Sequence, residues 1–162
     1  MLLTAEQVGE RQWRSWLEEW NKEVPVPKAA IMKGSWEEFI SASIASETFD
    51  YDFGVPQFMR GYMVNGVLAG VVTVRTRLTP KLEIRGGHIG YGLRPSMRSQ
   101  GLALPMFKAS QRLAYDLGLV EAIVTCAPEN ARSSKVIQKG GGVLIKTHPN
   151  SLVYRVELTG ST

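Results

Sequence analysis

Cysteine and histidine are scarce in this sequence, and their scarcity excludes several classes of protein. The 162 residues include one cysteine, Cys126, and two histidines. A single cysteine cannot form a disulfide within the chain, which is typical of proteins that work in the reducing cytoplasm. Because a structural zinc site needs four cysteine or histidine ligands close together, we expect no metal site.

Long apolar segments are also missing. No run approaches the roughly 20 apolar residues that span a bilayer. The first residues lead directly into Glu6, Glu10 and Arg11, without the apolar centre of a secretory signal peptide. With 44% hydrophobic and 21% charged residues, the composition is that of a globular protein. We therefore predict a single domain over residues 1–162 that is cytoplasmic and has no membrane partner, with a homodimer as an open alternative to a monomer.

The excess of positive charge is modest. The formal net charge is +4, with 19 basic and 15 acidic residues. No dense run of Lys and Arg with interleaved aromatic residues is present, so nucleic acid is not an expected partner. The same excess suits a small polyanionic ligand, and it is equally compatible with an ordinary soluble surface.

Two helices are predicted before residue 50. The first starts at a capping box, Thr4 to Gln7, and continues to about Lys22, where the proline-rich stretch 24–27 ends it. The second starts at Ser35 and should bury three side chains: Phe39, Ile40 and Ile44. We expect the tryptophans of the first helix to pack in the core.

Beyond residue 56 the apolar pattern changes to the period of two that indicates strands. Strands at 57–64 and 67–77 are joined by Asn65-Gly66, a pair that favours a two-residue hairpin. The remaining elements are predicted as a strand at 87–93, a helix at 101–117, an apolar strand at 120–126, a helix from Asn130 to about Gly140, and strands at 143–146 and 152–158. The expected fold class is α/β: a mixed, mostly antiparallel sheet with one parallel strand pair and helices on both faces.

The helix at 101–117 begins in an unusual way. Its start lies in RSQGLALP, residues 98–105, where small residues and Pro105 replace a hydroxyl or carboxylate cap. A proline costs little in the first turn, because the N–H groups there have no intrahelical partner. The N–H groups of 99–104 are exposed at the positive end of the helix dipole, Gly101 permits close approach, and Arg98 adds a positive charge. The loop is therefore predicted to bind an anion, most naturally phosphate, which would cap the helix.

Two stretches between Gly86 and Gly142 carry a family pattern: GGHIGYGLRPSMRSQGLALPMFKASQRLAYDLGL and VEAIVTCAPENARSSKVIQKGGG. They resemble the GNAT superfamily of acyl-CoA-dependent N-acetyltransferases, and GGHIGYGLRPS is similar to an uncharacterised bacterial subgroup. The resemblance implies one GNAT domain that moves an acetyl group from acetyl-CoA, its co-substrate, to a primary amine by direct attack. The acceptor would be a small-molecule amine or a peptide amine.

The resemblance also implies which residues bind coenzyme A. Leu93 and Arg94 would pair their backbone with the pantetheine arm, in a gap between two strands, and an N–H near Leu93 could polarise the thioester carbonyl. Asn130 and Ser133 match the family's Asn-x-x-Ser motif, whose Asn contacts the pantetheine. They also suit a helix N-cap, and the two roles are compatible. The pyrophosphate would be held beside Arg98 by the backbone amides of the loop: Ser99, Gln100, Gly101, Leu102 and Ala103.

One position departs from the family. Many members have a tyrosine seven residues after this Asn, which protonates the departing thiolate, but here the position is Ile137. We assign no general acid, although a thiolate is a tolerable leaving group near neutral pH. The alternative function is therefore a coenzyme-A-binding sensor or interaction module with little catalytic activity.

His88 is the residue that we predict to be catalytic, as the base that deprotonates the amine. Alternation along the strand at 87–93 places His88, Gly90 and Gly92 on one face, which leaves room beside the imidazole. An imidazole titrates near neutral pH, which suits a general base. The alternative is a histidine that is hydrogen-bonded within the sheet.

The acceptor is predicted to lie beside the acidic loop ETFDYDFG, residues 47–54. Glu47, Asp50 and Asp52 concentrate negative charge there in an otherwise basic chain, which favours a cationic substrate. A solvated loop without a binding role is the alternative.

Overall fold

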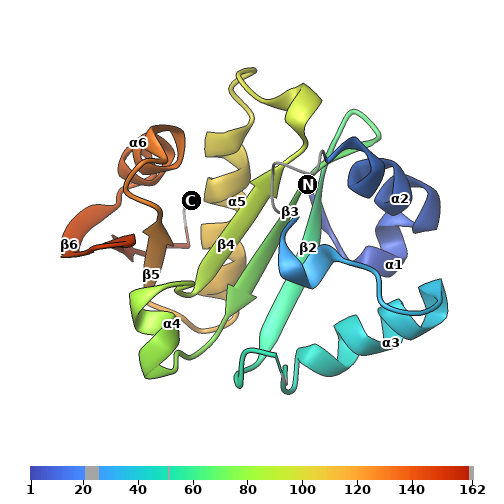
Figure 1. The fold of residues 1–162 in the computed structure, drawn as a ribbon, viewed down its shortest axis with the longest axis horizontal. Coiled ribbons are helices and arrows are strands. Elements are labelled where there is room, and N and C mark those ends of the chain that lie inside the picture. Colours follow the sequence, from blue (N-terminus) through green and yellow to red (C-terminus); the bar gives the residue numbers. More distant parts are fainter. Residues whose placement is uncertain (21–25, 51, 161–162) are drawn as a thin grey trace.

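The computed structural model describes residues 1–20, 26–50 and 52–160, with its elements in the order shown in Figure 1. The strands are β1 (Leu2–Leu3), β2 (Gln57–Val64), β3 (Val67–Arg75), β4 (Ile89–Leu93), β5 (Glu121–Cys126), β6 (Val143–His148) and β7 (Ser151–Glu157). The helices are α1 (Ala5–Val8), α2 (Glu10–Glu19), α3 (Trp36–Ser46), α4 (Pro80–Ile84), α5 (Ala103–Asp116) and α6 (Ala131–Lys139), with short 3-10 helices at Lys28–Ala30 and Pro95–Met97.

The strands form two antiparallel sheets. The first has the order β1-β2-β3-β4 and the second the order β5-β7-β6. The mixed α/β class is confirmed, but the predicted parallel strand pair is not found among the described residues, where every strand ladder is antiparallel and β4 and β5 belong to different sheets. The sheets meet just before β4, where the His88 N–H donates to the Ile123 carbonyl (2.7 Å).

This junction depends on a glycine. Gly87 has a φ of +64°, and a Cβ there would lie 2.4 Å from the carbonyl oxygen of Ile123. Only glycine permits the backbones to approach so closely in this conformation. Figure 1 shows β4 and β5 separating from this point, with α6 beyond the gap.

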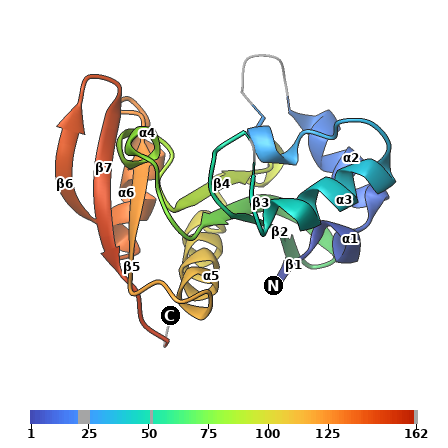
Figure 2. The ribbon, with the colours of Figure 1, turned by 90° about the horizontal axis from the view of Figure 1, so that it is seen from below.

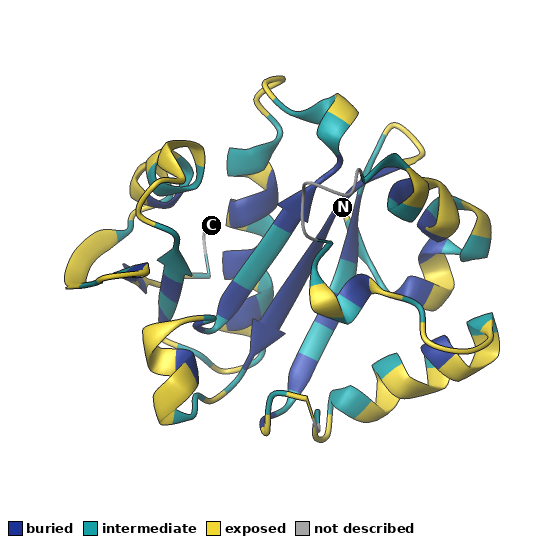
Figure 3. Cartoon of the chain, viewed as in Figure 1, coloured by how far each residue is buried: buried dark blue, intermediate teal, exposed yellow. Residues whose placement is uncertain are grey.

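Helices cover both faces of the first sheet, as predicted (Figure 2). Val71 packs with the aromatic cluster of α1, α2 and α3, which includes Trp13 and Trp16. Its neighbour Val72 packs with Met106 of α5, because successive side chains of a strand point to opposite faces. The burial pattern follows this arrangement: β3 is buried along most of its length, whereas β6 and the outer side of α3 are exposed (Figure 3).

The N-terminal helices partly match their predictions. The capping box predicted at Thr4 is confirmed, and Ser35, where the second helix was predicted to start, also forms one. The first helix is divided into α1 and α2 at Gly9, whose φ of +90° is incompatible with an α-helix. Its predicted end at Lys22 lies outside the described residues. The prediction that Ile44 is buried is wrong, since its side chain is 59% exposed.

Helix α4 was not predicted from the sequence, and it occupies a stretch predicted as a turn. Thr79 caps it by accepting a hydrogen bond from the Leu82 N–H, and Pro80 stands at its first position, where a proline is tolerated. None of the helices in the described part of the chain combines the length and the apolar character needed to cross a membrane.

Candidate functional site

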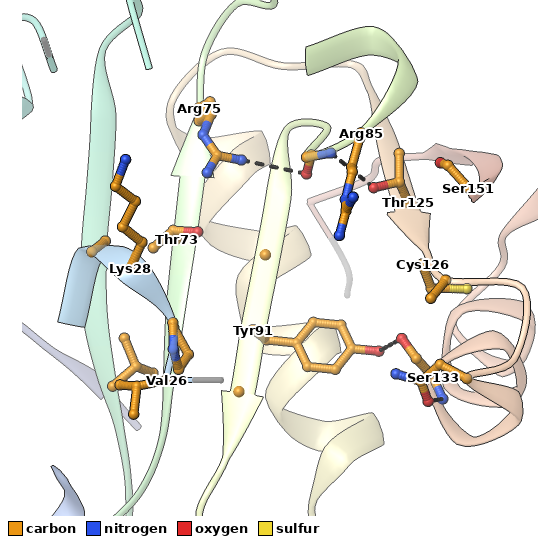
Figure 4. A pocket seen from close by; sticks show the side chains of 18 of the residues that line it. Val26, Lys28, Thr73, Arg75, Arg85, Tyr91, Thr125, Cys126, Ser133 and Ser151 are labelled. Carbon is orange, nitrogen blue, oxygen red and sulfur yellow. Dashed lines mark hydrogen bonds between the residues drawn. The ribbon is translucent and has the colours of Figure 1, made fainter. Parts of the chain in front are cut away.

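A cleft lies where the two sheets separate. One cavity of about 500 Å³ adjoins another of about 480 Å³, and we call the two together the cleft; they share five lining residues: Trp20, Tyr91, Gly92, Asn130 and Ser133. Figure 4 shows the larger cavity, with β3 and β4 on one side and α6 on the other. We call the end that reaches the start of α5 the coenzyme end, and the end that reaches Arg75 the acceptor end.

The edge of β4 supplies main-chain groups to the cleft. Arg94 N–H donates to Ala69 O (2.6 Å) and Arg75 N–H donates to His88 O (2.7 Å), which fixes the register between β3 and β4. Because backbone groups alternate in direction along a strand, those of Tyr91 and Leu93 point away from β3 and toward the cleft. The Leu93 carbonyl accepts a hydrogen bond from Arg98 Nε (3.2 Å).

Arg94, by contrast, is engaged in the first sheet and in α2. Besides its backbone bond to Ala69, its side chain donates from Nε to Leu68 O (2.8 Å) and forms a salt bridge with Glu19 (2.8 Å). This bond and the one from the Ser96 N–H lower the pKa of the Glu19 carboxyl, against the effect of burial. Of the two residues predicted to pair with the pantetheine, only Leu93 therefore directs its N–H into the cleft.

The start of α5 has the predicted form. Leu102 occupies the N-cap position without a side-chain hydrogen bond, and the main-chain N–H groups of 99–104 have no hydrogen-bond partner among the described residues. Ser99 and Gly101 adopt positive φ values of 61° and 75°. Unpartnered N–H groups at a helix start form a site for an anion.

Charged and apolar side chains complete the coenzyme end. The Arg98 guanidinium lies 5.1 Å from the Trp20 ring centroid, and Ser99, Ala103 and Arg132 line the same cavity. Neither Trp20 nor Arg132 was singled out from the sequence. Arg132 was within reach of sequence reasoning, because it lies inside the Asn-x-x-Ser motif, one residue before Ser133.

Asn130 and Ser133 both lie on the cleft. Asn130 is the N-cap of α6, with its Oδ1 accepting from the Ser133 N–H (3.1 Å), so its amide nitrogen keeps its capacity to donate. The Ser133 hydroxyl lies 3.1 Å from the Tyr91 hydroxyl and connects α6 to β4 across the cleft (Figure 4). Burial raises the pKa of Tyr91, so its hydroxyl stays protonated at neutral pH.

Two other positions clarify the chemistry of the cleft. Ile137 is fully buried in the core between α5 and the second sheet, and it does not line the cleft. Cys126, at the end of the apolar strand predicted at 120–126, is half-buried and lines the larger cavity. Burial raises the pKa of its thiol, so it is not a thiolate at neutral pH.

His88 connects the two sheets. Its Nδ1 accepts a hydrogen bond from the Ile123 N–H (2.8 Å), in addition to the backbone bond between the same residues. Burial lowers the pKa of the imidazole, so it is neutral at pH 7. His88 is not one of the described residues that line the cleft. This placement matches the alternative of a histidine hydrogen-bonded within the sheet, and the catalytic role stays a prediction.

The carboxylates of the acidic loop have partners on the protein. Glu47 forms a salt bridge with Arg60 (2.6 Å) and Asp52 one with Lys33 (3.3 Å). Asp50 accepts a hydrogen bond from the side chain of Gln57. Asp50 and Asp52 line a separate cavity of about 110 Å³. The loop reaches the main cleft through a residue that we did not predict, Phe53.

The family model for the acetyltransferase (GNAT) domain matches residues 7–143 of this sequence. The chain belongs to the GNAT acetyltransferase family. It is thus an acetyl-CoA-dependent N-acetyltransferase, and acetyl-CoA is its acetyl donor. A group of three or more His, Cys, Asp or Glu side chains that could hold a metal ion is absent from the described residues.

Solved structures of other GNAT proteins are similar in fold. A GNAT acetyltransferase from Streptococcus pneumoniae superposes with a TM-score of 0.66 at 15% identity, over 98% of this chain and 99% of its own. Spermidine N-acetyltransferase SpeG from Vibrio cholerae gives 0.61 at 12% identity, over 97% and 93%. RimL, a ribosomal-protein α-N-acetyltransferase solved with coenzyme A, gives 0.62 at 15% identity, over 98% and 94%. No curated protein matches the sequence.

Proposed function

We propose that this GNAT enzyme acetylates a primary amine by direct attack of the amine nitrogen on the thioester carbonyl of acetyl-CoA. The observation that carries the proposal is that the two cavities adjoin, because a donor held at the coenzyme end would then lie next to an acceptor in the larger cavity. A C–N bond forms and the C–S bond breaks. The nitrogen loses a proton and the coenzyme thiolate gains one.

The coenzyme end fits a pyrophosphate. The unpartnered N–H groups of Ser99, Gln100, Gly101, Leu102 and Ala103 would donate to its oxygens, and Arg98 would supply a full positive charge. Asn130 would donate from its amide nitrogen to the pantetheine arm. The Leu93 N–H on the open edge of β4 would donate to the thioester carbonyl oxygen as negative charge develops there.

Tyr91 is the group best placed to protonate the thiolate. The residue lines both cavities, and burial raises the pKa of its hydroxyl above the usual value, so the proton is present at neutral pH. Ser133, 3.1 Å away, holds the hydroxyl in the cleft. Tyr91 thus takes the role that Ile137 cannot have.

In this proposal His88 is a positioning residue that connects the two sheets, and it does not act as the base. A neutral imidazole whose Nδ1 accepts an N–H carries its own proton on Nε2, so taking a proton at Nδ1 would require loss of the Ile123 bond. The predicted role of His88 as a base is therefore an alternative to its role in holding the sheets together, and a variant of His88 can distinguish the two roles. The predicted acceptor contacts of Glu47, Asp50 and Asp52 likewise stay predictions.

One observation favours the alternative of a sensor or interaction module: the family's acid position is occupied by Ile137, in the core. The two functions differ in turnover. We would incubate the protein with acetyl-CoA and a panel of amines and measure free thiol, and in parallel measure its melting temperature with acetyl-CoA.

An enzyme releases thiol in an amine-dependent manner, whereas a sensor is stabilised by acetyl-CoA without releasing it. At a hundredfold excess over the dissociation constant, binding adds about 2.7 kcal/mol of stability. That corresponds to a rise of roughly 5–10 °C for a domain of this size. The absence of both thiol release and stabilisation would contradict both functions.

A further inference from the structure

The acceptor end of the cleft is lined by positive charge. Lys28, Arg75 and Arg85 line the larger cavity, whereas Asp and Glu are absent from its described lining residues. Figure 4 shows the three cations surrounding the end of the cavity away from Ser133. A cavity with this lining attracts an anionic group and repels a cationic one.

Arg75 is the buried member of the three. The residue is 6% exposed and stands at the end of β3. Its Nη1 donates to the carbonyls of Gly87 (3.0 Å) and Gly86 (3.4 Å), whereas Nε and Nη2 have no hydrogen-bond partner among the described residues. The guanidinium carbon lies 4.3 Å from the Phe53 ring centroid, which fixes its plane.

The charge of Arg75 is not neutralised by a salt bridge with any described residue. Burial lowers its pKa to about 10, so it remains charged at neutral pH. Asp50 is the carboxylate whose field acts on it, but Asp50 is bound to Gln57 and to the Asp52 N–H of its own turn. A buried cation without a counter-ion destabilises a fold, and an anionic ligand relieves this cost.

The other two cations stand at the rim. Lys28 and Arg85 are exposed, and Figure 4 shows the Arg85 side chain projecting into the cavity. The Lys28 amino group lies 5.7 Å from the centroid of the same Phe53 ring. The three cations come from the 3-10 helix at Lys28–Ala30, from β3 and from the end of α4, so the fold brings them together from distant parts of the sequence.

We propose that the acceptor amine carries an anionic group, a carboxylate or a phosphate, which Arg75 binds together with Arg85 and Lys28. This inference rests on the proposed acetyl transfer and names its substrate class. Arg75 stands three residues along β3 from Val72, which pairs with Tyr91, a separation of roughly 10 Å. The anionic group is thus held at one end of the cavity while the amine reaches toward Tyr91. A cationic acceptor, which the acidic loop suggested, does not fit this lining.

The test compares amines that differ only in the anionic group. The carboxylate arm uses γ-aminobutyrate against butylamine, the phosphate arm phosphoethanolamine against ethanolamine, and putrescine serves as the cationic acceptor. Thiol release gives kcat/KM for each amine. Binding of each amine to the coenzyme A complex, measured by calorimetry, gives a second readout that does not require turnover.

The variants are Arg75→Gln, Arg85→Gln and a matched control, Lys81→Gln, whose exposed side chain lies on α4 outside the cleft. Arg85 is exposed, so its variant keeps the inference testable if Arg75→Gln does not fold. Wild type should prefer one anionic amine over its neutral partner by about 10- to 100-fold, the ratio that a charged hydrogen bond gives. Both arginine variants should lose most of this preference, and Lys81→Gln should keep it.

The outcomes separate this inference from the acetyl transfer itself. Acetylation of neutral amines or putrescine as fast as of the anionic amines overturns the inference and leaves the transfer standing. A preference that survives in both arginine variants also overturns it. If the protein acetylates no amine, the proposed acetyl transfer is wrong. The calorimetric comparison of anionic with neutral amines then tests the anionic acceptor by itself.

Discussion

The two ends of the cleft differ in the groups that they offer to a ligand. The coenzyme end presents main-chain N–H groups from one continuous loop, residues 99–104, at the start of α5. The acceptor end presents side chains from positions 28, 53, 75 and 85. Main-chain recognition depends on a local conformation that many sequences can adopt, whereas the acceptor end depends on a few particular side chains. We therefore expect the coenzyme to be common to the fold and the acceptor to be particular to this chain.

The largest expected effect concerns Tyr91, which lies between the two ends. Tyr91→Phe removes the hydroxyl but keeps the ring packed against Phe107. If the hydroxyl protonates the thiolate, kcat should fall about 10²-fold with little change in acetyl-CoA affinity. Because burial raises the pKa of Tyr91, any loss of rate from its deprotonation should begin at a higher pH than it would for an exposed tyrosine.

Tyr154→Phe is the matched control for this change. Its hydroxyl also lies beside a serine of α6, Ser134 (2.6 Å), but Tyr154 does not line the cleft. Equal kcat losses in the two variants would show that the Tyr91 hydroxyl acts through stability alone.

The second effect concerns the coenzyme end. Gly101→Val should weaken acetyl-CoA binding by about tenfold or more, because a branched residue disfavours the positive φ that holds the loop open and places methyl groups beside the phosphate site. Gly118→Val is the matched control, since Gly118 also has a positive φ and open space at its Cβ but follows the other end of α5. Calorimetric titration of both variants measures the difference, and equal affinities would place the coenzyme elsewhere.

A smaller effect is expected where the sheets meet. His88→Ala leaves the half-buried Ile123 N–H without its acceptor, which should cost about 1 kcal/mol of unfolding free energy. Because the folded pKa of His88 is lowered, the unfolded state binds more protons just below pH 6.5. The free energy of unfolding of the wild type should therefore decrease as the pH falls from about 6.5 through the folded pKa of His88. The variant should lack this decrease.

Denaturant titrations at several pH values measure this loss. The rate of His88→Ala decides its chemical role. If His88 is the base, kcat of the variant should be about 10²-fold lower at pH 7 and should recover at high pH. If His88 is a positioning residue, the pH profile of kcat should be unchanged in the variant.

The smallest effect is expected at the acidic loop. Asp52→Asn removes a salt bridge between two largely exposed side chains, and such pairs contribute at most about 1 kcal/mol. The Michaelis constant for the preferred amine should change by less than about twofold. A large increase in this constant for a cationic amine would restore the prediction that the loop carboxylates bind the acceptor.

The difference between the ends also explains what the sequence could predict. The open conformation of the loop at 99–104 was predictable because its evidence is local: Arg98, Gly101 and Pro105 lie within eight residues of sequence, followed by an amphipathic helix. Helix caps at Thr4 and Ser35 were predictable for the same reason. The order of the strands followed from their periodicity, except that periodicity does not reveal which neighbour β5 takes.

The acceptor end could not be predicted, because its residues meet only through tertiary structure. Lys28 and Arg85 are 57 positions apart, and nothing in the sequence places both beside Phe53. The partners of the acidic loop could not be predicted for the same reason: Lys33 and Arg60 form salt bridges with two of its carboxylates, whereas the sequence shows only the acidic cluster. Likewise, strand alternation placed His88 on the face of Gly90 and Gly92 but could not show Ile123 beside its ring.

A crystal structure of the protein with coenzyme A and the preferred amine tests the central claim most directly. The pyrophosphate should accept hydrogen bonds from the N–H groups of Ser99 to Ala103, with the thiol near Tyr91 and the anionic group of the amine on Arg75. Coenzyme A bound away from the start of α5, or an amine whose anionic group points away from Arg75, would contradict the account.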